Sequence, residues 1–316
     1  MFDNPDLHHL NWKYWQPRAD WPRPRSFVLA EGAELIAHAA VIPAMCAWDS
    51  RRVTMLQTID WVARSDSVGG VTLLKYFARL SDGLISIGGA EKTQRILPHL
   101  GFRPAGIATG YARPLAPLRL LQGGATWRLP TRLARAIWRR SAAEAPQSHW
   151  RAQRLAVEEL SRIASVSPRP RDGLAVTERS EGLFRYFLSC PAVPMQIYAV
   201  ENADRVRGYF LLAPVPGQVR IADCWMDSAE PADWRALVLC AVAQARHEPQ
   251  AAEVVAYASD ALLAGALRSC GFDARFELPV RVRPSVADAM PQGTLRVQML
   301  DTDDAFLFLG RHEHWG

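Results

Sequence analysis

The sequence predicts an α/β (α+β) protein made of two repeated units, each a mixed, mostly antiparallel sheet flanked by helices. The first observation behind this prediction is that stretches with the two-residue period of strands and stretches with the period of helices follow one another in the same order twice. The second is that each round ends in a helix-like stretch and a Gly-Phe pair, and the two glycines, Gly101 and Gly271, lie 170 residues apart. A chain of 316 residues is also long enough for about two domains.

The first unit begins with a hairpin whose turn lies at Gly32, between two runs of alternating apolar residues. A third strand, an amphipathic helix, a short apolar strand and a second helix follow. We expect strands over residues 26–29, 34–41, 54–62 and 84–87, and the first helix over residues 71–80. The second helix stops at Gly101, where glycine fits the left-handed position that follows a helix.

The second unit repeats this order, with Asn202, Ala203 and Asp204 at the turn of its hairpin. We expect strands over residues 196–200, 206–212, 219–226 and 253–258, and a helix over residues 231–246. Phe27 and Ile197 occupy equivalent places in the two hairpins and are also 170 residues apart. Two points that share one offset indicate a repeat more strongly than either point alone.

An Arg-rich segment joins the two units. Between Arg113 and Arg154 the sequence has nine arginines and one acidic residue, Glu144, and residues 150–164 have helical spacing. The predicted parts of the chain are an N-terminal domain over 1–113, a partly helical linker over 114–165 and a C-terminal domain over 166–316. A solvated linker is the simpler interpretation of the positive charge. Weak contact with an anionic membrane or a nucleic acid is the alternative.

The composition argues against several classes of protein. No apolar run reaches the ~18 residues of a membrane-spanning helix. The first residues lack the basic and then apolar order of a secretory signal, so we expect a cytoplasmic protein. The five cysteines are odd in number, widely spaced and without a CxxC motif, which argues against a disulfide framework or a structural zinc site. We expect them to be reduced core residues, and no spacing predicts a metal site.

Two glycines stand where the third strand gives way to a helix. Ser, Thr, Asp and Asn are the usual residues at the start of a helix, so Gly69 and Gly70 need an explanation. A bound anion is one explanation, because the free N–H groups and the dipole at a helix start favour negative charge. The backbone N–H groups of residues 68–71 would then be the donors, and Arg64 or Lys75 would add charge. A plain turn of the chain is the alternative interpretation.

The order of elements and this loop resemble the GNAT (acyl-CoA N-acyltransferase) superfamily, in a tandem two-domain form distantly similar to mycothiol synthase and the FemAB-type transferases. The N-terminal half carries the resemblance over residues 25–104. In that family acyl-CoA lies between two splayed strands, and its pyrophosphate sits on a loop of the form Gln/Arg-x-x-Gly-x-Gly/Ala. The matching segment here, SDSVGG, keeps only Gly70 of the motif, with Ser65 and Val68 at its other two positions. The resemblance implies cofactor contacts from Val62, Arg64, Val68, Gly69, Gly70 and Val71.

The same resemblance implies an N-acyltransferase that moves an acyl group from acetyl-CoA, or a related acyl-CoA, to an amine or amino-sugar acceptor by direct attack. The C-terminal half has carboxylates, Asp227, Glu230 and Asp233, where the phosphate would sit, so we expect it to be degenerate and without CoA. Two alternatives stay open. One is a catalytically inactive GNAT-derived binding module, and the other is a FemAB-like aminoacyl transferase.

Asp60 is the first candidate for the base that takes a proton from the amine, because it lies on the strand that leads into the glycine loop. Strand alternation places Ile59 and Trp61 on one face and Asp60 on the other. A solvent-facing charge is the alternative role for Asp60. Glu91, at the start of the next helix, is the second candidate, although stabilisation of the helix dipole explains it equally well.

The acid that protonates the leaving thiolate is harder to identify. Many members of the family have a tyrosine a few residues before the Gly-Phe pair, but here Leu97 stands there. Tyr111 and Tyr14 are the substitutes that the sequence offers. His38, a lone histidine on a strand, is expected to be a packed core residue. The aromatic and basic segment over 8–18 either covers the acceptor site or packs on the sheet, and we favour packing for its tryptophans.

Overall fold

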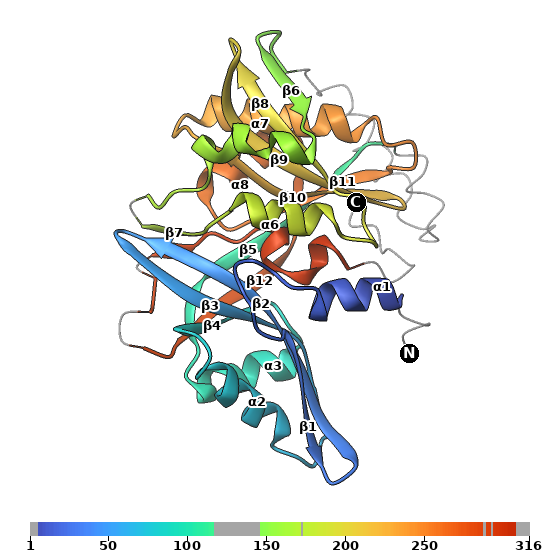
Figure 1. Ribbon diagram of the computed structural model, residues 1–316. Coiled ribbons are helices and arrows are strands. Elements are labelled where there is room, and N and C mark those ends of the chain that lie inside the picture. The colour runs from blue at the N-terminus through green and yellow to red at the C-terminus, as the bar shows by residue number, and fades with distance from the viewer. Residues whose placement is uncertain (1–5, 117–145, 172, 287–288, 292, 308–316) are drawn as a thin grey trace, which may run out of the picture.

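The computed structural model describes residues 6–116, 146–171, 173–286, 289–291 and 293–307 and is drawn in Figure 1. The N-terminal half contains α1 (Leu7–Leu10), the π-helix η1 (Asn11–Trp15), β1 (Ser26–Glu31), β2 (Glu34–Trp48), β3 (Arg51–Ala63), α2 (Gly69–Phe77), β4 (Gly83–Ile87), α3 (Glu91–Ile96), the 3-10 helix η2 (Leu97–Leu100) and β5 (Arg103–Pro114). The C-terminal half contains β6 (Trp150–Arg154), the 3-10 helix η5 (Val157–Val166), β7 (Leu174–Thr177), α6 (Glu181–Leu188), β8 (Gln196–Asn202), β9 (Arg205–Val215), β10 (Gln218–Met226), α7 (Pro231–Ala245), β11 (Glu253–Ala258), α8 (Ala261–Ser269), β12 (Asp273–Pro284), β13 (Thr294–Leu295) and the short 3-10 helices η6 (Met299–Asp301) and η7 (Asp303–Ala305).

The predicted elements occur in the predicted order in both halves, and β7 and α6 are elements before the second hairpin that the sequence did not predict. Gly101 and Gly271 both have a left-handed backbone, with φ of 86° and 80°, which confirms the two predicted helix ends. The helical prediction over 150–164 is wrong in its first part, because residues 150–154 form β6, and only the second part is helical, as η5. β6 pairs with β8, whose backbone groups on that side would otherwise lack partners, and these hydrogen bonds outweigh the helical spacing. Residues 117–145 of the predicted linker lie outside the described part of the chain.

The 13 strands of the described residues form one continuous mixed sheet in the order β13-β7-β2-β3-β4-β12-β5-β11-β10-β9-β8-β6, with β1 paired to β2. Most neighbours are antiparallel. The two central parallel pairs are β3 with β4 and β10 with β11, one in each half. The predicted α/β (α+β) class with a mostly antiparallel sheet is confirmed, but the sequence did not predict that the two halves share one sheet.

The two halves exchange strands at their junction. β12, from the C-terminal half, lies between β4 and β5, while β5, from the N-terminal half, lies between β12 and β11. In these pairings Ile87 is opposite Val280, and Gly110 is opposite Tyr257. The offset of 170 residues found in the sequence carries Ile87 onto Tyr257 and Gly110 onto Val280. The two pairings are therefore equivalent under that offset.

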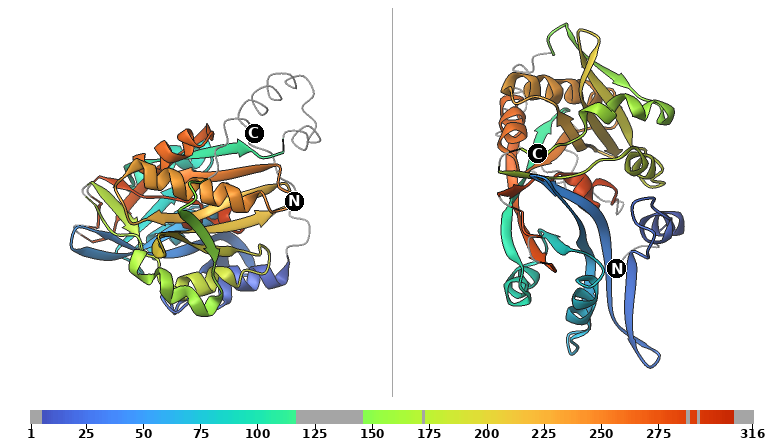
Figure 2. Two further views of the ribbon diagram at one scale, coloured as in Figure 1. Left: turned by 90° about the horizontal axis from the view of Figure 1, so that it is seen from above. Right: turned by 60° about the vertical axis from the view of Figure 1, so that its left-hand side comes forward.

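Apolar side chains bury both faces of the N-terminal strands. On one face, Leu73, Leu74 and Phe77 of α2 pack against the sheet in a cluster of their own. On the other face, the N-terminal segment and α6 belong to the large core of the C-terminal half, so α1 and α2 lie on opposite sides of β2 and β3 (Figure 2). Trp12 is buried as predicted, but Trp15 is 59% exposed, so its predicted packing is wrong.

All five cysteines are buried, as predicted. Within the described ranges, no helix combines the length and the apolar character that a membrane crossing requires.

Candidate active site

The parallel strands β3 and β4 separate part-way along their length. They pair from Met55 with Gly83 to Gln57 with Ile85, and no further pair follows, although β3 continues to Ala63. We call the space between residues 58–63 and residues 86–88 the N-terminal splay. Backbone groups that face such a space lack sheet partners, so side chains, water or a ligand must satisfy them.

The outer end of the N-terminal splay is the start of α2. The residue before this helix, Val68, is 77% exposed and makes no capping hydrogen bond from its side chain. Within this turn the hydroxyl of Ser67 accepts a hydrogen bond of 3.3 Å from the N–H of Gly69. No acidic residue lies in the first turn. The positive end of the helix dipole therefore faces the mouth of the splay without a carboxylate of its own helix to neutralise it.

The two glycines of the loop have a packing role that the sequence did not reveal. A Cβ atom on Gly70 would lie 2.5 Å from Nε1 of Trp61, and one on Gly69 would lie 2.9 Å from Cβ of Ala37. The room that the missing side chains leave is therefore not free for a ligand. That room is occupied by the sheet, and glycine lets α2 dock closely on it.

The other predicted cofactor contacts surround the mouth of the splay. Val62 and Val68 are exposed, and Val71 is half-buried. Arg64 is held by two carboxylates: its Nη1 atom lies 2.6 Å from Glu34, and its guanidinium makes two bonds of 3.0 Å to Asp66. Arg64 would have to exchange these partners to bind a phosphate.

Asp60 lies at a β-bulge in the splayed part of β3. A shift in register against β2 leaves Asp60 and Trp61 opposite a single residue, and Asp60 has a φ of 49°. The bulge resets the alternation of side chains. Ile59 consequently packs in the large core and Trp61 on the α2 side, so the prediction that these two share one face is wrong.

The carboxylate of Asp60 is the centre of a polar cluster formed with the N-terminal segment. Its Oδ2 atom accepts a hydrogen bond of 2.7 Å from Tyr14 Oη and lies 2.7 Å from Lys13 Nζ. Lys13 also lies 3.1 Å from Asp303 Oδ2, and its side chain is only 4% exposed, against 31% for Asp60. A lysine and a tyrosine that are distant in sequence thus meet a carboxylate on the splayed strand.

The protonation states in this cluster follow from burial and charge. Burial lowers the pKa of Lys13, but the carboxylates of Asp303 and Asp60 outweigh burial and raise it above its usual value. Burial, together with the nearby negative charge of Asp60, raises the pKa of Tyr14. Both groups therefore keep their protons at neutral pH and are donors toward Asp60.

His38 holds the backbone of the bulge. Its Nδ1 atom lies 3.2 Å from the carbonyl oxygen of Asp60, and its Nε2 atom lies 3.0 Å from Ser26 Oγ. A carbonyl oxygen only accepts, so Nδ1 carries the proton and Nε2 accepts from the hydroxyl of Ser26. His38 is half-buried and hydrogen-bonded, in line with the packed role that the sequence predicted.

The other two predicted catalytic residues lie apart from this cluster. Glu91 is exposed at the start of α3 and pairs with Arg95 one turn later. Tyr111 is buried in the core of the C-terminal half, where its hydroxyl accepts a hydrogen bond of 2.9 Å from Arg268. Of the two substitutes for the missing tyrosine, Tyr14 is the one that contacts Asp60.

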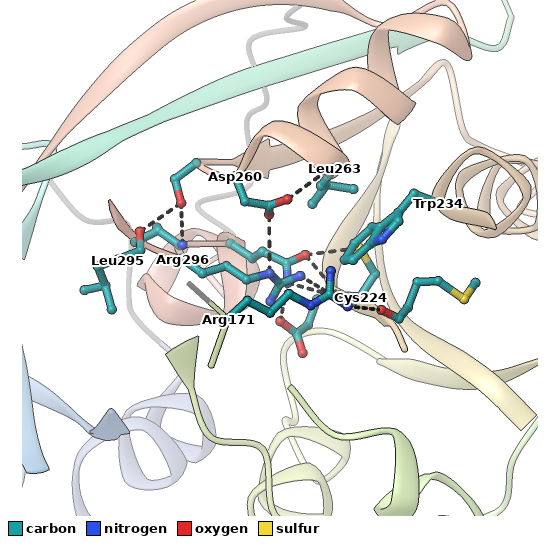
Figure 3. Close-up of polar contacts among 12 residues, drawn as sticks. Arg171, Cys224, Trp234, Asp260, Leu263, Leu295 and Arg296 are labelled. Atoms are coloured by element: carbon teal, nitrogen blue, oxygen red, sulfur yellow. Dashed lines mark hydrogen bonds and ion pairs between the residues drawn. The ribbon is translucent and has the colours of Figure 1, made fainter. Parts of the chain in front are cut away.

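The C-terminal half has a matching splay that the chain itself fills. β10 and β11 pair only as far as Ile221 with Ala256. Beyond that point residues 295–298 run between the two strands (Figure 3). We call this region the C-terminal splay.

On one side of the C-terminal splay, the hydroxyl of Ser259, next to β11, accepts a hydrogen bond of 2.7 Å from Val297 N. On the other side, Oε1 of Gln298 accepts one of 3.0 Å from the N–H of Cys224 in β10. Arg296 lies 3.4 Å from Asp260 (Figure 3). Its guanidinium lies over the ring of Trp225. The backbone of this splay is therefore satisfied from within the protein.

Comparison with known proteins agrees on the fold. No protein-family model and no curated protein matches the sequence. A GCN5-related N-acetyltransferase from Anabaena variabilis ATCC 29413 matches with 15% identity over 83% of this chain and 63% of its own, at a TM-score of 0.53. A probable N-acyltransferase from Enterococcus faecalis V583 matches with 9% identity over 90% and 66% of the two chains, at a TM-score of 0.58. Saccharomyces cerevisiae N-myristoyltransferase, solved with bound myristoyl-CoA, matches with 14% identity over 79% and 67%, at a TM-score of 0.52.

The chain has a GNAT-like fold. It spans 63% of the length of the Anabaena protein and 66% of the Enterococcus protein. Two of these neighbours are named acetyl- or myristoyltransferases and one a probable N-acyltransferase, and at these identities the likeness shows the fold. They do not bear on the narrower resemblance to mycothiol synthase or the FemAB-type transferases.

Proposed function

We propose that this protein is an N-acyltransferase that moves an acyl group from acetyl-CoA, or a related acyl-CoA, to an amine. The observation that carries the proposal is the N-terminal splay, which combines two parted strands with a helix start at its mouth that has no acidic residue and no cap from the side chain of Val68. This arrangement offers an anion site at one end and unpaired backbone along the way, as an extended phosphate-bearing ligand requires. The matching C-terminal splay is filled, which leaves one such site in the described part of the chain.

In this proposal the residues of the splay have separate tasks. The first N–H groups of α2 bind the pyrophosphate, and the bulge at Asp60 places a backbone turn beside the acyl group. The amine nitrogen forms a bond to the acyl carbon, and the carbon–sulfur bond breaks. Asp60 accepts the proton that the amine loses, and Tyr14, which donates to Asp60, is the nearest hydroxyl that can return a proton to the leaving thiolate.

Two substitutions at Val68 test the anion site without disturbing the packing of α2. Val68 is exposed and stands at the capping position, where Asp and Asn are both favourable, so Val68→Asp and Val68→Asn should each preserve the helix. Val68→Asp also places a negative charge beside the proposed pyrophosphate. We expect it to weaken acetyl-CoA binding about tenfold or more, while Val68→Asn binds like the wild type.

Isothermal titration with acetyl-CoA and with CoA measures both variants directly, and a ligand-induced rise in melting temperature is the second readout. Gly70→Glu is a poorer test, because any side chain there meets Trp61. Equal affinities for the two Val68 variants would contradict the proposed pyrophosphate site. A wild-type protein that binds no CoA compound, but is retained on heparin or on anionic vesicles, would instead favour an inactive binding module.

A further inference from the structure

A small cavity lies at the inner end of the N-terminal splay, on the face opposite α2. Gln57 and Ile85, the last paired residues of β3 and β4, form part of its wall, and Leu183 and Phe187 of α6 cover it. The cavity has a volume of about 20 Å³, which is enough for one water molecule. It is thus placed where β3 and β4 begin to separate, and both halves of the chain contribute to it.

The proposed function fixes which part of a ligand reaches this cavity. The pyrophosphate would bind at the outer end of the splay, near residues 63–70, and the strand from there back to Gln57 is roughly 20 Å long. An acyl-CoA that lies along the splay therefore directs its acyl end toward the inner end. The length of the acyl group is then limited by what the cavity accepts.

The walls of the cavity are held in place. Arg18 bonds to Asp20 and to the carbonyl oxygen of Pro43, and Arg179 is paired with Asp223 and Asp301. The covering residues of α6 belong to the large core. A cavity with such walls does not enlarge by the rotation of a free side chain, so its size excludes a long alkyl chain.

One polar atom in the cavity wall has no partner among the described residues. Gln57 is 3% exposed, and its Oε1 atom is buried without a hydrogen bond. A water molecule in the cavity would satisfy this oxygen. An alkyl chain that displaced the water would leave the oxygen buried and unpaired, which is unfavourable. Size and polarity therefore act in the same direction.

We propose that this cavity restricts the donor to short acyl groups, with acetyl-CoA as the preferred class, and that Gln57 is the specificity-determining residue. The inference rests on the proposed function. It differs from what is known of the yeast structural neighbour, which was solved with bound myristoyl-CoA. The same fold would thus accept a long chain there and reject it here.

Binding of an acyl-CoA series tests this without knowledge of the acceptor. We would titrate the full chain with CoA, acetyl-CoA, butyryl-CoA and octanoyl-CoA. Butyryl-CoA should bind about tenfold more weakly than acetyl-CoA in the wild type, and octanoyl-CoA more weakly still. Gln57→Leu should bring the affinity for butyryl-CoA close to that for acetyl-CoA. Gln57→Leu should not lower the melting temperature, because no described residue bonds to the oxygen that it removes, whereas loss of a structural hydrogen bond would lower it.

Ile87→Ala is the second variant, since it enlarges the cavity and leaves Gln57 intact. It should favour butyryl-CoA over acetyl-CoA relative to the wild type. Leu263→Ala, a buried deletion in α8 outside the cavity, and Gln153→Leu, on the exposed strand β6, are the matched controls and should leave the acyl preference unchanged. Octanoyl-CoA binding as tightly as acetyl-CoA would overturn the inference while the proposed function stands. Absence of binding by CoA and all three thioesters would overturn both.

Discussion

The two splays of this protein contain the same chemistry in different surroundings. Ile85 in β4 and Val255 in β11 are related by the 170-residue offset, and their partners are Gln57 and Arg220. Three residues after these partners come Asp60 and Asp223. Asp60 contacts a lysine and a tyrosine, and Asp223 contacts an arginine and a tyrosine, but the side chain of Asp60 is 31% exposed and that of Asp223 is 0% exposed.

The difference lies in what fills the space between the strands. In the C-terminal splay, Gln298 donates to Asp223 at 2.9 Å, and Arg179 binds it through two bonds of 3.0 Å. All acceptor positions face protein, so this carboxylate has a structural role. In the N-terminal splay, the described chain supplies no such segment, and Asp60 keeps one side open. An equivalent carboxylate is thus available for chemistry in one half and committed to folding in the other.

The largest expected effect is on the rate of acyl transfer, and it distinguishes Asp60 from Asp223. If Asp60 is the base, Asp60→Asn should lower acyl transfer by about 10²–10⁴-fold and leave acetyl-CoA affinity unchanged. Steady-state rates of CoA release measure the first quantity, and titration measures the second. Glu91→Gln is the control, because Glu91 is exposed and pairs only with Arg95 among the residues described. Unchanged turnover in Asp60→Asn would remove Asp60 from the mechanism.

The same substitution in the other splay should act on stability. Asp223→Asn leaves the buried guanidinium of Arg179 with only the carboxylate of Asp301, and we expect a loss of about 3 kcal/mol in the free energy of unfolding. Urea denaturation monitored by circular dichroism gives this number. Asp60→Asn should cost about 1 kcal/mol or less, because Asp60 is partly exposed. Equal losses in the two variants would mean that the two splays do not differ as described.

The stability that the Lys13 ammonium contributes at the N-terminal splay depends on pH. The pKa of Lys13 is raised in the folded protein. The stabilisation from its ion pairs is therefore fully present below the unfolded pKa of about 10.4, and it is lost as the pH rises through the folded pKa. We expect Lys13→Met to be less stable than the wild type by about 2 kcal/mol between pH 7 and about 9, a value between those of exposed and buried ion pairs. The difference should shrink at higher pH. Denaturation curves measured from pH 7 to above about pH 10 would show this decrease. A difference in the free energy of unfolding that grows with pH would contradict the raised pKa of Lys13.

The smallest expected effect concerns Tyr111, one of the two tyrosines that the sequence offered as the acid. Tyr111→Phe removes a hydrogen bond from Arg268 and should cost about 1 kcal/mol of stability without changing acyl transfer. Tyr14→Phe is its counterpart at the open splay and should lower transfer. If Tyr111→Phe abolished transfer while Tyr14→Phe did not, the roles assigned to the two tyrosines would be reversed.

The order of elements was predictable because it depends on local pattern. Alternation and helical spacing identified the strands, and the glycine at each helix end marked the repeat, since Gly101 and Gly271 need left-handed backbone. Asp60 was chosen as the candidate base because it lies on the strand that leads into the glycine loop, and its catalytic role stays a prediction. The error at Trp150–Arg154 arose where a tertiary partner, β8, overrode local spacing.

The remainder of the site was not predictable, because it depends on contacts between distant parts of the chain. Asp303 lies 290 residues after Lys13, with which it pairs. The bulge places the side chain of Trp61 on the opposite face of the sheet. The only sign of this bulge in the local sequence is Asp60, a residue type that tolerates positive φ. The cavity has walls from both halves, and no local pattern predicts that α6 packs beside Gln57.

The exchange of β5 and β12 has a mechanical consequence. Each of these strands is hydrogen-bonded on both edges to strands of the opposite half, β5 to β12 and β11, and β12 to β4 and β5. Moving the two halves apart as rigid bodies would break the hydrogen bonds of several strand pairs at once. A ligand that enters the open splay must therefore be admitted by rearrangement of loops and side chains, with the central scaffold staying rigid throughout.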